Sequence, residues 1–376
     1  MIRRLHNGDW GIIFGNGLGS ASGDAGIYVM TVNPSTAAVT TYYLSAGQAG
    51  KSDGIAYVSP VAMAGDHITD YVYAGDVNGN VWRFDLTSNN PSNWAVTPGP
   101  IFTTPSGQPI TSLVQPAFVT NASTGAIQVM LYFGTGEEFP ITNSSAPSFA
   151  SGTQSFYGVW DWNMGTWNAH SLTQFASLTS AQVTSLTGTS ASTLSVSNLV
   201  QQTVTTDSSN NRNIGTTNPI CWAGTQTCTG TDNQFGWYIN LPGSNSGYNQ
   251  TTNEQVVFNP QIISTAVVFN STLPGIDSPL ACNSGAAQGW TYSIDARTGG
   301  PVPSFFVNNG NTHTIAYPSD ASGTDSVVTT TGTNSSGATV VQDWLVYQTN
   351  LGEHGEQQIN TANDITGSRA TWIELR

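Results

Sequence analysis

The fold is decided by one stretch of sequence, which reads Tyr71-Val72-Tyr73-Ala74-Gly75-Asp76-Val77-Asn78-Gly79-Asn80-Val81-Trp82-Arg83-Phe84-Asp85-Leu86. Its two halves are rich in aromatic and β-branched residues, and they flank the dipeptide Asn78-Gly79. Asn-Gly between two such runs is the strongest short-range signal for a β-hairpin, because both residues accept the positive φ angles of a tight turn. The stretch therefore predicts two antiparallel strands joined at this dipeptide.

The same pattern, an apolar strand that ends in Gly and is followed by a polar turn and an aromatic strand, recurs along the chain. Repeated hairpins spaced by tens of residues are typical of β-propellers. Because a regular blade takes about 40–50 residues, a chain of 376 residues suits a single all-β propeller of about seven irregular blades with loop insertions. The further copies pair 11–17 with 25–30, 131–136 with 155–161, and 261–269 with 289–300.

The composition agrees with an all-β chain and excludes two classes of partner. The 40 Gly and 18 Pro indicate many turns, and charged residues, which include several strong helix formers, make up only 8%. The 8 basic and 22 acidic side chains give a net charge of −14. No basic patch can form, so neither nucleic acid nor an anionic lipid surface is expected as a partner.

We expect residues 1–376 to form one propeller domain, with a Ser/Thr-rich insertion over 171–218 and a flexible loop over 320–338. No run of 18 apolar residues occurs, so no membrane span is predicted. The first six residues include Arg3 and Arg4 but are not followed by an apolar region, which does not fit a signal peptide. If the protein is exported, we therefore expect the chain to be an excised domain or a mature fragment.

At the 71–86 stretch the sequence closely resembles the C-terminal β-propeller of the type IV pilus tip-associated adhesin and biogenesis family (PilC-like proteins). Single motifs such as Phe-Gly-Thr-Gly are weak, but an ordered series of them is more specific. The other segments that resemble this family in the same order are 4–10, 14–17, 133–136, 154–161, 199–203, 236–238, 256–260, 289–300 and 367–372.

This resemblance implies a non-catalytic protein that is exported and acts at the tip of a type IV pilus, outside the cell. Its implied partners are minor pilins of the tip complex and a host-surface or glycan ligand. Its implied roles are to promote pilus assembly, to oppose retraction and to mediate adhesion. The N-terminal half that is usual in the family, often with an adhesive domain, is absent from this sequence.

The resemblance also implies a calcium loop just before the 71–86 hairpin. Calcium prefers six to eight oxygen ligands, which such a loop supplies at its first, third, fifth, seventh and ninth positions. These positions hold Ala62, Ala64, Asp66, Ile68 and Asp70, so two of the four carboxylate ligands are missing. Asp66, Asp70 and the Ile68 carbonyl could hold calcium weakly. The alternative is that the two Asp residues are ordinary turn residues.

The remaining motifs leave other possibilities open. Cys221 and Cys228 are close enough to close a small disulfide loop, and Cys282 is left over. The 290–299 segment resembles a blade of quinoprotein dehydrogenases, which would make the chain an enzyme with a calcium-held quinone. The 11 Trp and the many Asn would also suit a glycan-binding propeller, a function compatible with adhesion.

Overall fold

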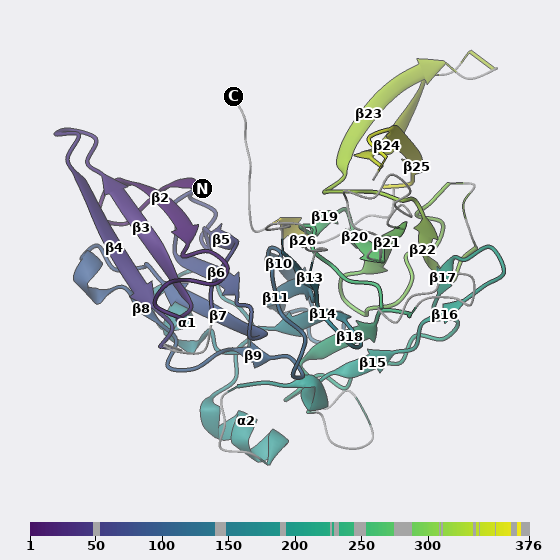
Figure 1. Ribbon diagram of the computed structural model, residues 1–376. Coiled ribbons are helices and arrows are strands. Elements are labelled where there is room, and N and C mark those ends of the chain that lie inside the picture. Colours follow the sequence, from purple (N-terminus) through teal and green to yellow (C-terminus); the bar gives the residue numbers. More distant parts are fainter. Residues whose placement is uncertain are drawn as a thin grey trace.

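The structure is a computed structural model, and its described residues form a mostly β domain (Figure 1). Four sheets of four to six strands follow one another, and a three-stranded sheet, here called the arm, stands out from the rest. The described residues are 1–47, 53–139, 148–188, 193–225, 228, 233–243, 253–273, 288–307, 309, 311–333, 336–337, 339–349, 351–361 and 367–369.

The predicted hairpin is present as β6 (Tyr71–Gly75) and β7 (Asn80–Asp85), which pair in antiparallel fashion. The Asp76 carboxylate organises the turn by accepting hydrogen bonds from the backbone N–H groups of Asn78 and Asn80 and from the indole of Trp82. Gly79 has a φ of +83°, and a Cβ there would lie 1.9 Å from the Thr104 hydroxyl. Only glycine fits both constraints, which explains why position 79 of the Asn-Gly dipeptide is glycine.

The first two sheets contain all the described strands between residues 1 and 103. In sheet one the strands are in chain order, and sheet two continues from β5 to β8 with β9 also paired to β7. Their bounds are β1 (Ile2–Arg4), β2 (Trp10–Gly15), β3 (Gly26–Val32), β4 (Val39–Ser45), β5 (Val58–Val61), β8 (Ala95–Val96) and β9 (Phe102–Thr103), with a 3-10 turn η1 at Pro91–Asn93.

Sheets three and four contain six strands each and draw on distant parts of the chain. Sheet three has the order β15-β18-β14-β11-β10-β26, and sheet four has the order β16-β17-β22-β21-β20-β19. Their bounds are β10 (Gln115–Thr120), β11 (Ile127–Gly134), β14 (Ser155–Trp160), β15 (Val200–Gln202), β16 (Thr205–Thr206), β17 (Arg212–Asn213), β18 (Gly236–Asn240), β19 (Gln261–Ile263), β20 (Ala266–Leu273), β21 (Gln288–Asp295), β22 (Thr314–Pro318) and β26 (Gly367–Arg369).

The remaining elements are short or peripheral. The arm consists of β23, β24 and β25, and a separate two-stranded ribbon pairs β12 with β13. Their bounds, with those of the helices, are β12 (Glu138–Phe139), β13 (Ser148–Phe149), β23 (Ser326–Thr333), β24 (Thr339–Gln348), β25 (His354–Ile359), α1 (Gly165–His170), α2 (Ser180–Thr187) and the 3-10 turn η2 (Val196–Asn198).

The strand pairs predicted from the repeated pattern are confirmed in all four sheets. The pairs β2–β3, β6–β7, β11–β14 and β20–β21 are each adjacent and antiparallel. Four sheets with at least four strands are formed within the described ranges, so the expected count of about seven blades is not confirmed.

Aromatic side chains fill the space between sheets three and four. Phe156 of β14 stacks on Phe269 of β20 with ring centroids 3.8 Å apart, and Phe269 stacks in turn on Tyr292 of β21 at 4.7 Å. These rings belong to the largest apolar cluster, which reaches from sheet two to sheet four. A second cluster lies between sheets one and two. Face-to-face packing of successive sheets therefore builds the core.

Two expectations about loops need correction. Residues 326–333, inside the predicted flexible loop 320–338, form strand β23, because the β-branched run Val327–Thr331 suits a strand paired along its length with β24. Part of the expected insertion 171–218 is built into the sheets: β15 pairs in parallel with β18 of sheet three, and β17 pairs with β22 of sheet four. No helix in the described part of the chain is long and apolar enough to cross a membrane.

Candidate functional site

The loop between β5 and β6 brings the three predicted calcium ligands into one segment. The Asp66 side chain is exposed, and its Oδ1 accepts a hydrogen bond of 3.0 Å from the backbone N–H of Ile68. Asp70 is buried, and its Oδ2 accepts one of 2.6 Å from the N–H of Met63. Both carboxylates therefore stabilise the loop itself, as expected of Asp residues in turns.

The second oxygen of Asp70 binds a residue that is distant in the sequence. His6, in the turn between β1 and β2, places Nε2 at 2.7 Å from Asp70 Oδ1. The backbone joins the same two segments, because the N–H of Thr69 donates to the carbonyl of Arg4 at 2.9 Å. The hydrogen bond to Asp70 raises the pKa of His6, and partial burial opposes that rise. The pair thus connects sheet one to the loop of sheet two.

His6, Asp66 and Asp70 line a pocket of about 490 Å³. Its wall is completed by the short helix α1, which contributes Trp167 and His170, and the Trp167 ring meets Tyr71 edge-on at 6.0 Å. Pockets of this volume accept a small ligand or a side chain of a partner. The wall combines carboxylate, imidazole, hydroxyl and aromatic groups, but it contains no Lys or Arg.

The loop is a poor fit for calcium in this arrangement. Both oxygens of Asp70 already accept hydrogen bonds, and calcium needs six to eight oxygen ligands. Within the described ranges, no group of three or more His, Cys, Asp or Glu side chains is placed to hold a metal ion.

The His6–Asp70 contact predicts a pH-dependent stability. A histidine whose pKa is higher in the folded than in the unfolded state contributes stability that is complete below its unfolded pKa and is lost as the pH rises through the folded pKa. Because His6 is partly exposed and faces Asp70, Asp66 and Asp85, solvent screening limits the effect to below about 1 kcal/mol. Between pH 5.5 and pH 8.5 the melting temperature should fall further for the wild type than for His6→Gln. An equal change in both proteins would contradict the assignment.

A buried ion pair joins sheets two and three. Asp161, which follows β14, accepts hydrogen bonds at Oδ2 from Arg83 Nη1 at 2.7 Å and from the Tyr73 hydroxyl at 2.8 Å. The Arg83 guanidinium also lies over the Tyr71 ring, 4.9 Å from its centroid. Arg83 and Tyr73 belong to the hairpin that indicated the fold, so this hairpin is attached to the next sheet by charge as well as by apolar packing.

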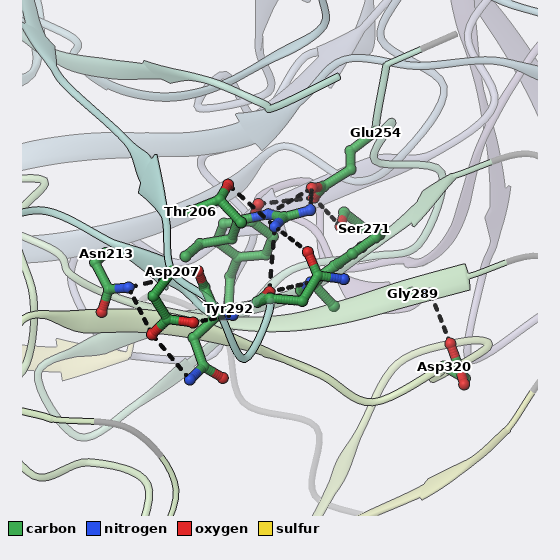
Figure 2. Close-up of polar contacts among 12 residues, drawn as sticks. Thr206, Asp207, Asn213, Glu254, Ser271, Gly289, Tyr292 and Asp320 are labelled. Atoms are coloured by element: carbon green, nitrogen blue, oxygen red, sulfur yellow. Dashed lines mark hydrogen bonds and ion pairs between the residues drawn. The ribbon is translucent and has the colours of Figure 1, made fainter. Parts of the chain in front are cut away.

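A second buried ion pair lies in sheet four. Arg212 of β17 donates to Glu254 Oε1 from Nε at 2.8 Å and from Nη2 at 2.6 Å. The hydroxyls of Ser271 and Tyr292 each donate to Glu254 Oε2 at 2.7 Å. Figure 2 shows Ser271 and Tyr292 beside the Glu254 carboxylate. Burial raises the pKa of Glu254, and the Arg212 charge and the two hydroxyls oppose that rise.

The segment that carries Glu254 also links two sheets. Gln255 exchanges backbone hydrogen bonds with Thr272 of β20, and the N–H of Val256 donates to the carbonyl of Thr135, which follows β11. The buried polar groups of sheet four therefore hold the segment that joins it to sheet three.

The two close cysteines are bonded in the structure. Cys221 and Cys228 form a disulfide with their Cα atoms 5.6 Å apart. The adjacent Trp222 packs edge-on against Trp160 of sheet three, with ring centroids 6.3 Å apart. The loop that the disulfide closes is thus anchored beside sheet three. Cys282 lies outside the described residues.

The sequence alone did not reveal how His6, Trp167 and His170 contribute. His6 lies in a turn, and its partner Asp70 lies 64 positions away in the sequence. The only signal for His6 was its place in the family-like segment 4–10, and the two α1 residues lie in no family-like segment. Local spacing therefore found the carboxylates of the pocket but not the side chains that face them.

Comparisons with known proteins agree with this architecture. A family model described as "PilY1 beta-propeller domain" matches residues 1–195. Type IV pilus biogenesis factor PilY1 of Pseudomonas aeruginosa is 29% identical over 325 residues, covering 80% of this chain and 25% of that protein. A PilY1 homolog of Xylella fastidiosa is 24% identical over 314 residues, covering 79% and 18%.

A solved structure has the same fold. The crystal structure of the Pseudomonas aeruginosa PilY1 C-terminal domain superposes with a TM-score of 0.59 and 22% identity, covering 96% of this chain and 71% of that one. This chain spans about a quarter or less of the length of these curated relatives. The resemblance read from the sequence is confirmed, and the chain belongs to the PilY1 beta-propeller domain family.

Proposed function

We propose that this chain acts in type IV pilus biogenesis as a protein of the pilus tip, outside the cell. It promotes assembly or opposes retraction together with minor pilins, and it mediates attachment to a surface or host cell. The observation that carries this proposal is the family match, because curated relatives along four fifths of the chain are named type IV pilus biogenesis factors. In this proposal residues 1–376 work as one propeller unit of about seven blades.

The proposal is tested by deleting the gene and counting surface pili by electron microscopy. We expect pili to be lost, and to return when retraction is disabled as well, because a factor that opposes retraction is not needed where retraction is absent. Normal pili with lost attachment would restrict the function to adhesion. Normal pili with normal attachment would contradict the proposal.

We propose that the role is not enzymatic, against the quinoprotein alternative. The relatives are named for pilus biogenesis and not for a reaction. Adding the quinone and calcium to the purified chain should produce no bound cofactor absorbance, and a stoichiometric absorbance would favour the dehydrogenase.

Glycan binding is a second candidate, favoured by the pocket beside the 62–70 loop. Its wall of aromatic, hydroxyl, carboxylate and imidazole groups suits a neutral sugar, which binds through ring stacking and hydrogen bonds. A glycan array with the purified chain tests it. His170 is exposed, so His170→Ala should weaken a binding that occurs in this pocket without unfolding the chain.

Any calcium held by Asp66, Ile68 and Asp70 should be held weakly. Two carboxylate ligands of the loop are missing and Asp70 is engaged with His6 and Met63, so we expect a Kd above about 1 mM, at or beyond the weak end for extracellular calcium sites. The measurement is the melting temperature in EDTA against increasing calcium, with Asp66→Asn as the control. A shift that saturates below about 0.1 mM and disappears in the control would overturn this expectation.

A further inference from the structure

The arm is attached to sheet four at its base, although most of it stands out from the molecule (Figure 1). Leu345 of β24 and Ile359 of β25 are buried in an apolar cluster that also contains Ala266 and Val268 of β20. In contrast, residues 326–332 of β23 are all exposed. The position of the arm therefore depends on a local contact at its base.

Backbone hydrogen bonds also cross the junction between the arm and sheet four. They involve the loop between β21 and β22, the segment between β22 and β23, and the end of β25. The bonds, from N–H to carbonyl, are Val307 to Gln358 at 3.0 Å, Ser322 to Gln348 at 2.7 Å and Asn360 to Phe305 at 2.8 Å. We call the N–H groups of Val307, Ser322 and Asn360 the junction amides, because their protection reports whether the arm is attached.

A buried carboxylate lies where the chain enters the arm. Asp325 directly precedes β23 and is buried. Its Oδ1 accepts a hydrogen bond of 2.7 Å from Asn270 of β20, whose amide also donates to the Gly323 carbonyl at 2.9 Å. The Asp325 carbonyl accepts one of 3.0 Å from the side chain of Gln261 of β19. Asp325 therefore connects the entrance of the arm to two strands of sheet four.

The Asp325 carboxylate has no compensating positive charge. Within the described residues, its buried Oδ2 has no hydrogen-bond partner, and no Lys, Arg or His forms an ion pair with it. The titratable groups that face it are the phenols of Tyr317 on β22 and Tyr347 on β24, with the Asp320 carboxylate near Tyr347. Two neutral phenols and a second carboxylate cannot offset a buried negative charge, so these surroundings favour the protonated form of Asp325.

The charge of Asp325 and the attachment of the arm are therefore coupled. We propose that Asp325 is a pH-sensitive latch, whose neutral form holds the arm on sheet four and whose ionised form weakens that attachment. Detachment carries the carboxylate into water, where its charge is no longer costly. It also uncovers the apolar cluster around Leu345 and Ile359. This inference does not depend on the proposed function.

The direction of the pH dependence follows from burial. Burial raises the pKa of Asp325 from 3.8 to about 6 in the attached state, and the hydrogen bond from Asn270 opposes that rise. In the detached state the carboxyl is in water, where its pKa is in the ordinary range. A group whose pKa is higher in the attached state contributes stability that is complete below its pKa in the detached state and is lost as the pH rises through its pKa in the attached state. The arm should therefore be held most firmly in acid and least firmly above about pH 6.

Hydrogen exchange tests the latch. Exchange of the junction amides is measured by mass spectrometry at about pH 4.5 and pH 7.5 for the wild type and for Asp325→Asn, which keeps the side chain neutral at both values. The two proteins are compared at the same pH, so intrinsic exchange rates and the other titrating groups cancel. The control is Glu356→Gln, which removes an exposed carboxylate from β25, and the reference peptide is β11, which is paired on both sides.

We expect the ratio of wild-type to Asp325→Asn exchange at the junction amides to rise about tenfold or more between the two pH values, in line with a pKa difference of about two units. The ratio for the β11 peptide should not change. A constant ratio at the junction amides would overturn the proposal. It would also be overturned by an equal rise in the β11 peptide, or by the same rise with Glu356→Gln in place of Asp325→Asn.

A second measurement covers the case in which Asp325→Asn does not fold. In the wild type alone, exchange of the junction amides is then divided by exchange of the β11 peptide after both are corrected for intrinsic rates. We expect this quotient to rise about tenfold or more between pH 4.5 and pH 7.5. A quotient that stays constant or falls would overturn the latch.

Discussion

Replacing Arg212 by methionine is expected to lower the free energy of unfolding by about 3–5 kcal/mol. Arg212 and Glu254 are both almost fully buried and lie 2.6 Å apart. Methionine fills much of the same volume but leaves the Glu254 carboxylate without a positive partner. The two hydroxyl donors of Ser271 and Tyr292 remain, but they do not neutralise a buried charge. Urea denaturation of the purified chain measures the difference.

Two controls distinguish the lost charge pair from a general effect of removing arginine. Arg297→Met breaks a similar pair with Asp295, but the Arg297 side chain is 44% exposed, so its cost should stay below about 1 kcal/mol. The double variant Arg212→Met with Glu254→Gln removes both charges and should recover part of the loss. A double variant as unstable as the sum of the single variants would contradict this explanation.

Replacing Asp161 by alanine should cost about 3 kcal/mol or more, because it leaves Arg83 buried without its counter-ion. The same substitution removes the acceptor of the Tyr73 hydroxyl. Both donors belong to sheet two and Asp161 follows β14 of sheet three, so the loss falls on the contact between two sheets. Thermal and urea unfolding should both report the change.

The matched control is Asp85→Asn, on the β6–β7 hairpin that also carries Arg83. Within the described residues, the Asp85 carboxylate accepts only local hydrogen bonds, from the N–H and hydroxyl of Thr87. Its substitution should therefore cost no more than about 1 kcal/mol. If Asp161→Ala and Asp85→Asn proved equally mild, the Arg83–Asp161 pair would not hold the two sheets together.

The sequence predicted those parts of the fold that depend on neighbouring residues. The hairpin at Asn78-Gly79 and the paired strands of the other sheets follow from alternation, aromatic content and turn residues. Strand β23 was missed because its β-branched run Val327–Thr331 lies within a segment rich in Ser, Thr and Gly. Its pairing with β24 selects the strand.

The polar contacts of the candidate site could not be predicted in the same way. His6–Asp70, Arg83–Asp161 and Arg212–Glu254 are separated by 64, 78 and 42 positions. Each pair depends on how whole sheets lie against one another, and no local spacing encodes that. The family resemblance located the loop before β6, but it gave no partner for Asp70.

The outermost pairing of sheet three also sets the order in which the domain can fold. β26, which contains Ser368, pairs with β10, which contains Phe118, so the sheet cannot be completed until nearly the whole chain has been synthesised. Pairings of such high contact order fold slowly, since loop-closure entropy must be overcome before the contacts form. Until then the edge of β10 is open to wrong partners. The folding rate of this domain should therefore be limited by the pairing of β26. A chain truncated before β26 should aggregate at temperatures below its unfolding temperature.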